Sequence, residues 1–179
     1  MRWRQFLLRE VIHLALVVGW IVLLHRTVSA YEVDGASMEP TLHTRQYVVV
    51  DTTGAENRSP QRGDVIIFHY PRDPRLEYVK RVIGLPGETV AVAHGQVLVN
   101  GLPLEEPYVR ERPRYLWGPA QVPPNSLFVL GDNRNSSSDS HLWGPLPLHL
   151  VVGHAWFAYG PFAGWKWLAG QTPSFVAAP

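Results

Sequence analysis

Cysteine is absent from this 179-residue chain, which excludes disulfide bonds, thiolate catalysis and cysteine-ligated metal sites. Lysine is scarce, because only Lys80 and Lys166 among the 16 basic residues are lysines. An excess of charge is also lacking: the net charge is +1, and no basic stripe or nucleic-acid-binding motif indicates a nucleic-acid partner. The eight histidines show no paired spacing, so we expect neither a metal nor a cofactor.

Turn-forming residues are abundant, with 16 prolines and 15 glycines, and they favour a mostly β fold with one compact domain. We expect a cytoplasmic N-terminus and membrane anchor at 1–30, a β domain at 31–160 and a C-terminal tail at 161–179. Within the domain, about 94–124 is predicted to be a β-ribbon or loop excursion from the core. Apolar patterning predicts strands at Tyr47–Val50, Val65–Phe68, Tyr78–Ile83, Val90–Ala93, Gln96–Val99, Leu127–Leu130 and Val151–Tyr159.

The N-terminal segment carries an apolar run, Val11–Leu24, which only His13 interrupts. As a helix, Phe6–Leu24 would measure about 28 Å, close to the ~30 Å hydrocarbon core of a bilayer. Arginines precede the run and Arg26 follows it, and the positive-inside rule places the N-terminus in the cytoplasm. A cleavable signal peptide ending in the small residues at 28–30 is the alternative, and this segment alone does not decide between them.

A candidate nucleophile lies just after this segment. Gly35 and Pro40 bracket a loop that can expose Ser37. Glu39 stands where the nucleophile elbow of an α/β-hydrolase would have its second glycine, so that fold is not indicated. A serine hydroxyl also needs a base, and a serine beside a glycine is more often an ordinary turn residue.

Lys80 is the candidate base. Period-two alternation places it on one strand face with Tyr78 and Val82, while Arg81 points the other way. Burial on that face could lower its pKa by up to about 3–5 units, leaving a neutral amine able to take the Ser37 proton. Taken without other motifs, these residues favour the alternative, a lysine that packs its stem and directs its amine to solvent.

Four motifs occur in a fixed order along the chain, and each contains a candidate or its surroundings. Together they resemble the boxes of the bacterial type I signal peptidase (leader peptidase) family, which are serine proteases with a Ser-Lys dyad. The motifs are Gly35–Thr41, Arg62–Phe68, Lys80–Glu88 and Gly131–Ser140.

The resemblance implies a role for each residue around the serine. Ser37 would be the acylating nucleophile and Lys80 its general base, while the Ser37 N–H would form part of the oxyanion hole. Gly35 stands where some members have a second oxyanion donor, a serine. Met38 and Pro40 would contact the substrate.

The last motif supplies the implied supporting residues. Ser137 falls where the family has a serine that orients the lysine amine, and Asp139 where an acidic residue supports the site. Two positions depart from the family pattern, since Asn135 replaces an aspartate and His141 an arginine. An Asp139–His141 pair would be charged only when His141 is protonated.

The implied protein is a single-pass plasma-membrane enzyme with a coiled β-sheet catalytic domain outside the cytoplasm. It would cut exported preproteins after small residues, through an acyl-enzyme, without metal or cofactor and as a monomer. Its partners would be signal peptides and membrane lipid, with Trp117, Trp143 or Trp165 as candidates for contact with the lipid interface. The alternatives are a related Ser-Lys protease with a narrow substrate set, or a catalytically silent membrane-anchored β module.

Overall fold

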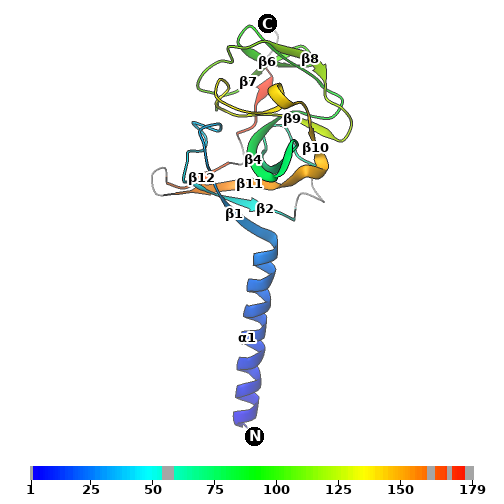
Figure 1. Cartoon of the computed structure of the whole chain (residues 1–179). Helices are drawn as coiled ribbons and strands as arrows, with labels where there is room; N and C mark the ends of the chain where they lie inside the picture. Colours follow the sequence, from blue (N-terminus) through cyan, green and yellow to red (C-terminus); the bar gives the residue numbers. More distant parts are fainter. Residues whose placement is uncertain (1, 54–58, 161–163, 169–170, 176–179) are drawn as a thin grey trace.

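In this computed structural model, the structure describes residues 2–53, 59–160, 164–168 and 171–175, without the side chains at 2, 4, 5, 8 and 21–26. Helix α1 (Arg2–Thr27) leads directly into strand β1 (Val28–Glu32) and projects from a body made of β-strands (Figure 1). The predicted mostly β fold is therefore confirmed.

The apolar side chains of α1 are largely exposed. Ten large hydrophobic residues of the helix are at least half exposed: Trp3, Phe6, Leu7, Val11, Ile12, Leu14, Leu16, Val17, Val18 and Trp20. The helix covers the segment in which we expected a membrane span, with Arg9, Glu10 and His13 near its start. Among the described residues, however, no helix has both the length and the hydropathy that a span requires.

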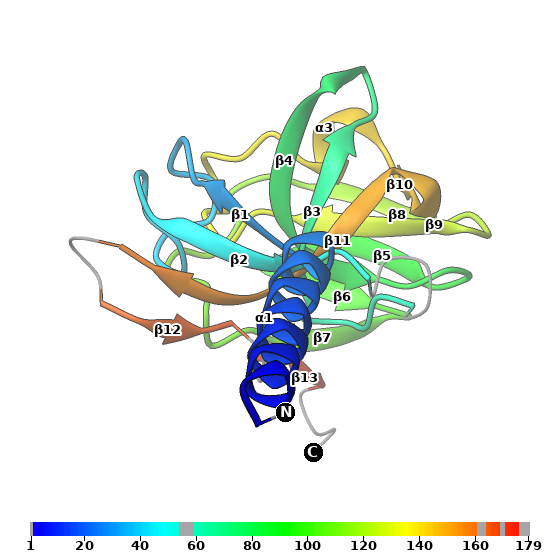
Figure 2. The same cartoon turned by 90° about the horizontal axis from the view of Figure 1, so that it is seen from below.

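Most strands belong to one large sheet with the order β1-β2-β11-β3-β4-β9-β10, and β12 pairs with β11. Each of the predicted strands in this sheet has a counterpart, and the one predicted at Val151–Tyr159 coincides with β11. Figures 1 and 2 show β1, β2, β11 and β12 on the side of the body that faces α1. The strands are β2 (Tyr47–Asp51), β3 (Val65–Tyr70), β4 (Asp73–Gly84), β9 (Ser126–Leu130), β10 (Leu146–Pro147), β11 (Val151–Tyr159) and β12 (Lys166–Trp167).

The segment at about 94–124, predicted to be a β-ribbon or loop excursion, contributes strands to a second sheet with the order β13-β7-β6-β5-β8. The hairpin between residues 89–93 and 96–99 has a two-residue turn at His94 and Gly95, and their φ angles of 52° and 72° suit such a turn. Apolar side chains of both sheets share one core cluster, in which Ile83 and Phe128 meet Val90. The strands are β5 (Thr89–Ala93), β6 (Gln96–Val99), β7 (Leu102–Glu105), β8 (Trp117–Gln121) and β13 (Ser174–Phe175).

The C-terminal tail, in which the sequence showed no pattern, joins the two sheets. Strand β12 pairs with β11 of the large sheet, and β13 pairs with β7 of the second. Between them, the carbonyl and side-chain oxygens of Gln171 accept hydrogen bonds from Arg81 at 3.4 and 3.2 Å. The described part of the tail therefore closes over the buried centre of β4.

Arg81 forms the most enclosed ion pair of the protein. Its guanidinium donates to both carboxylate oxygens of Asp132, at 2.9 and 2.7 Å, and both side chains are 0% exposed. Further donations to Gly63 O and to Thr41 Oγ1, with the ring of Tyr108 3.9 Å away, occupy the remaining faces of the guanidinium. A desolvated arginine without such partners would be costly.

We expect Asp132→Asn to lower the free energy of unfolding by about 3–5 kcal/mol, because it leaves the buried Arg81 charge without its counter-ion. Urea denaturation of the detergent-solubilised chain measures the loss. The matched control is Asp73→Asn, which breaks the exposed pair with Arg75 and should leave the midpoint nearly unchanged. Equal midpoints for the two variants would contradict the assignment of a structural role to the buried pair.

Candidate active site

Ser37 lies in a turn that the chain closes tightly after β1. Gly35, with a φ of 95°, directs the chain into the turn, and Leu42 N donates to Met38 O at 2.9 Å. The side chain of Met38 is buried in the core beside Leu42. This burial fixes the turn from beneath and leaves the neighbouring Ser37 hydroxyl on the open side.

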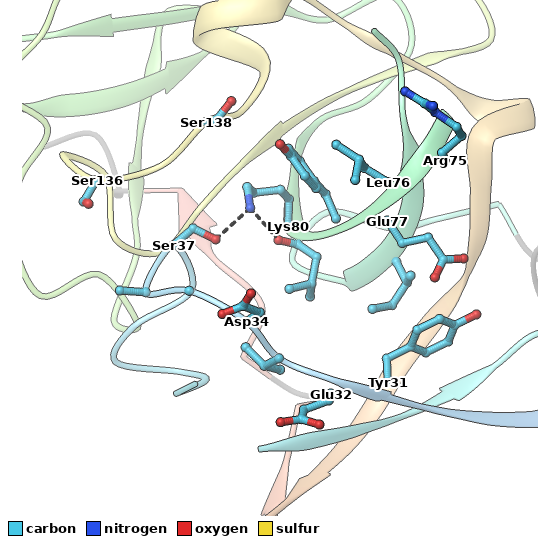
Figure 3. A pocket seen from close by; sticks show the side chains of 16 residues that line it. Tyr31, Glu32, Asp34, Ser37, Arg75, Leu76, Glu77, Lys80, Ser136 and Ser138 are labelled. Atoms are coloured by element: carbon cyan, nitrogen blue, oxygen red, sulfur yellow. Dashed lines mark hydrogen bonds between the residues drawn. The ribbon is translucent and has the colours of Figure 1, made fainter. Parts of the chain in front are cut away.

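Lys80 lies near the middle of β4, opposite Ile66 of β3. Its amine donates to Ser37 Oγ at 2.8 Å and to Val79 O at 2.8 Å (Figure 3). The ring of Tyr78 lies 5.3 Å from the amine, on the face that alternation predicted. The structure thus brings together two side chains that are 43 residues apart in the sequence.

Lys80 is buried and only 3% exposed. Burial lowers the pKa of Lys80 from 10.5 to about 8, against the opposing effect of the Asp139 and Asp132 carboxylates. At and above pH 8 much of the amine is therefore neutral, and its lone pair can accept the Ser37 proton.

The dipeptide Asp132–Asn133 positions both members of the Ser37–Lys80 pair. Asn133 donates from its backbone N–H to Ser37 O at 3.0 Å, and from Nδ2 to Ala36 O at 3.1 Å. Its neighbour Asp132 holds Arg81, the residue after Lys80. A small movement of this dipeptide would therefore change the distance between the hydroxyl and the amine.

Asp139 is fully buried behind the dyad. It accepts from Gly131 N at 3.0 Å and from His141 N at 3.2 Å, and so caps the short helix α3 (Ser140–Trp143). The His141 ring lies with Nδ1 2.6 Å from Asp139 Oδ1, so the two residues that the sequence paired are in contact. Asn135, the other departure from the family pattern, bonds to Arg112 O and Arg114 N instead.

Ser137 does not have the contact that we expected for it. Its hydroxyl is buried without a hydrogen-bond partner among the described residues, and the amine of Lys80 bonds elsewhere. The hydroxyl faces Gly131, where a Cβ would collide with both Ser137 Oγ and Ser37 O. Close packing against the glycine thus keeps this serine beside the dyad but out of hydrogen-bonding contact with Lys80.

An open cleft of about 580 Å³ surrounds the dyad. Its walls are residues 31–37 on one side and 75–80 of β4 on the other, and Figure 3 shows Ser136 and Ser138 beyond the dyad. Met38 and Pro40, for which substrate contacts were predicted, do not line this cleft. Met38 is 1% exposed within the core, and Pro40 lines a separate hollow beside His43.

The donor groups near Ser37 suit an oxyanion. In the described part of the chain, the N–H of Ser37 has no acceptor, and Gly35 presents open space where a side chain would project. No cluster of three or more potential metal ligands occurs among the described residues. A hydroxyl bonded to a desolvated amine in an open cleft is an arrangement in which a serine can act as a nucleophile with a lysine as its base.

Comparisons with known proteins agree with this class. The model of the family "Signal peptidase, peptidase S26" matches residues 3–160, and the chain belongs to that family. Signal peptidase I of Leptolyngbya laminosa is 47% identical over 132 residues, covering 70% of this chain and 65% of the relative's length. The probable signal peptidase I-1 of Synechocystis sp. is 43% identical over 150 residues, covering 80% of this chain and 74% of that protein.

A crystal structure of a signal peptidase I from Enterococcus faecalis V583 aligns with a TM-score of 0.49 and 34% identity, over 54% of this chain and 97% of that one. The resemblance read from the four sequence motifs is confirmed by the family match. The chain spans about two thirds of the length of the Leptolyngbya relative.

The scarcity of lysine makes the pKa of Lys80 directly measurable. We expect the chemical shift of Lys80 Cε, the carbon bonded to the amine, to change with a midpoint near pH 8, because burial of the amine disfavours its charged form. In protein labelled with ¹³C-lysine, Lys166→Arg leaves a single side-chain lysine signal to follow by NMR. A midpoint near the ordinary value of 10.5 would show that the amine is solvated.

Proposed function

We propose that this protein is a signal peptidase I, a membrane-bound serine endopeptidase that removes signal peptides from exported preproteins after small residues. The observation that carries the proposal is the 2.8 Å contact between Ser37 Oγ and the buried amine of Lys80. The names of the relatives from Leptolyngbya and Synechocystis support the same activity. The assembled dyad gives no support to a silent β module, and no described feature favours a narrow substrate set.

The geometry suits an acyl-enzyme mechanism. Ser37 Oγ attacks the scissile carbonyl carbon while the neutral amine of Lys80 takes its proton. The negative oxygen of the tetrahedral intermediate accepts a hydrogen bond from the Ser37 N–H and from backbone donors near Gly35. Lys80 then gives its proton to the leaving amine, and the peptide bond breaks to leave an ester on Ser37.

Hydrolysis of the ester repeats the same steps with water. Lys80, neutral again, takes a proton from the water that attacks the ester carbonyl, and returns one to Ser37 as the acid leaves. The Asp139 carboxylate favours the ammonium form that exists between these proton transfers. Asp139 thus acts as a positioning and electrostatic residue, while Ser37 and Lys80 exchange the protons.

We expect Ser37→Ala and Lys80→Arg each to lower kcat/KM on a preprotein in detergent by at least about a thousand-fold. The first removes the nucleophile, and the second replaces a titratable amine by a group that keeps its proton. Lys166→Arg is the matched control, because it makes the same change outside the cleft and should retain activity. Activity of Lys80→Arg near that of the control would exclude lysine as the base.

We also propose that α1 attaches the protein to a membrane, with the N-terminus in the cytoplasm and the β body outside. Support comes from the exposed apolar side chains of α1 and from aromatic residues at β11 and β12, strands that Figure 1 shows on the side of the body next to α1. There Trp165 is 83% exposed and contacts Phe157, with ring centroids 5.2 Å apart. Trp117 and Trp143 do not share this position, since they pack on Phe128 and on Phe68.

We expect the expressed chain to stay in the membrane pellet after alkaline carbonate extraction. Leu14→Arg combined with Val18→Arg should shift most of it to the supernatant, since each charge costs about 2.5–3.5 kcal/mol at the centre of a spanning helix. Leu116→Arg alters a still more exposed leucine of the β body and should leave the partition unchanged. Release of the wild-type chain by carbonate would contradict the attachment.

A further inference from the structure

The cleft has a direction that follows from how the chain enters it. Strand β1 continues from α1, so Tyr31 lies nearer to the helix along the chain than Ser37 does. Figure 3 shows Tyr31 and Glu77 on one side of the dyad and Ser136 and Ser138 on the other. A signal peptide held in the same lipid as α1 would therefore enter at the Tyr31 end, and the mature chain would leave past the serines.

The two walls of the entering half carry matching carboxylates. Asp34 precedes Ser37 by three residues, and Glu77 precedes Lys80 by three residues, and both side chains are exposed and line the cleft. Three residues of extended chain span about 10 Å. Within β4, Glu77 is thus level with the fourth substrate residue before the cut, counted from the residue that Ser37 acylates. Asp34 adds a second exposed carboxylate on the facing wall, beside the turn at Gly35.

Side-chain alternation decides which substrate residues meet these carboxylates. In an extended substrate the first and third residues before the cut point to one face, toward the dyad and the cleft floor. The second and fourth then point toward the rims, where Asp34 and Glu77 are exposed. The fourth residue is the one that lies level with Glu77.

This half of the cleft is negatively charged when the enzyme works. Among the described residues, neither Asp34 nor Glu77 forms an ion pair, and Glu32 only accepts from the Tyr47 hydroxyl at 3.3 Å. The nearest cation of the wall, Arg75, is held by two 2.8 Å bonds to Asp73. Lys80 contributes no compensating charge, because it acts as a base only in its neutral form.

We propose that Asp34 and Glu77 are specificity-determining residues that favour a basic side chain, and disfavour an acidic one, at the fourth position before the cut. The inference rests on the proposed function and names a charge preference of the same site. Exposed charge pairs have modest strength, so two carboxylates acting together should make kcat/KM about ten-fold higher for lysine than for glutamate at that position.

The test uses the full chain in detergent and three peptides that differ only at that fourth position, with lysine, glutamine or glutamate. Low salt preserves the interaction, and a pH well above 8 keeps most of the Lys80 amine neutral, so that changes in its titration have little effect. The ratio of kcat/KM for the lysine peptide to that for the glutamate peptide should fall about three-fold in Asp34→Asn and in Glu77→Gln. The double variant should bring this ratio near one. Glu77→Lys should lower it further than Glu77→Gln does.

Glu111→Gln is the control, because it removes a carboxylate that pairs with Arg114 outside the cleft and should keep the wild-type ratio. A wild-type ratio of one, or a ratio that the cleft variants leave unchanged, overturns the inference while the peptidase activity stands. Failure of the wild type to cleave any of the three peptides overturns the proposed function and the inference with it.

Discussion

The buried ion pair between Arg81 and Asp132 is the contact on which the geometry of the site depends. It joins the centre of β4 to the segment after β9, and each partner is adjacent to a residue that positions the dyad. Lys80 precedes the arginine, and Asn133, which follows the aspartate, holds the backbone of Ser37. A 2.8 Å hydrogen bond between residues far apart in sequence tolerates little error, so a rigid and desolvated link between their neighbours is needed.

The same packing sets the chemistry of the lysine. Full desolvation alone would push its pKa far down and make the amine a weak base, whereas full solvation would keep it charged. The structure lies between these limits, because Asp139 and Asp132 oppose the burial and the pKa comes to about 8. A carboxylate that is itself buried and hydrogen-bonded provides this opposing effect without opening the site to water.

Much of the architecture can be predicted from the sequence, and there are physical reasons why the remaining strands cannot. Buried strands such as β11 and the turn at His94 are encoded locally, by apolar runs and by residues that accept a positive φ. Strands β12 and β13 have only two residues each, too few for any periodicity, and exist through pairing with distant strands. The second sheet was missed because Pro-rich and charged segments hide its short strands β7 and β8.

The dyad was predictable from its motifs, but the surroundings of the dyad were less so. Met38 follows the serine directly and was expected to face the substrate, yet the turn reverses its direction and buries it. Arg81 was expected only to point away from Lys80, and its partner became evident from the fold. A buried arginine requires a carboxylate, and that requirement is the signal that could have linked it to Asp132.

The C-terminal closure has a consequence for the order of events during synthesis. Helix α1 is synthesised before the β body, while Gln171 and β13, which cover Arg81 and complete the second sheet, follow it by more than a hundred residues. A nascent chain that has reached its destination but lacks these residues has an arginine with incomplete coordination beside the general base. The geometry that places Lys80 beside Ser37 would then be complete only after these residues have been made.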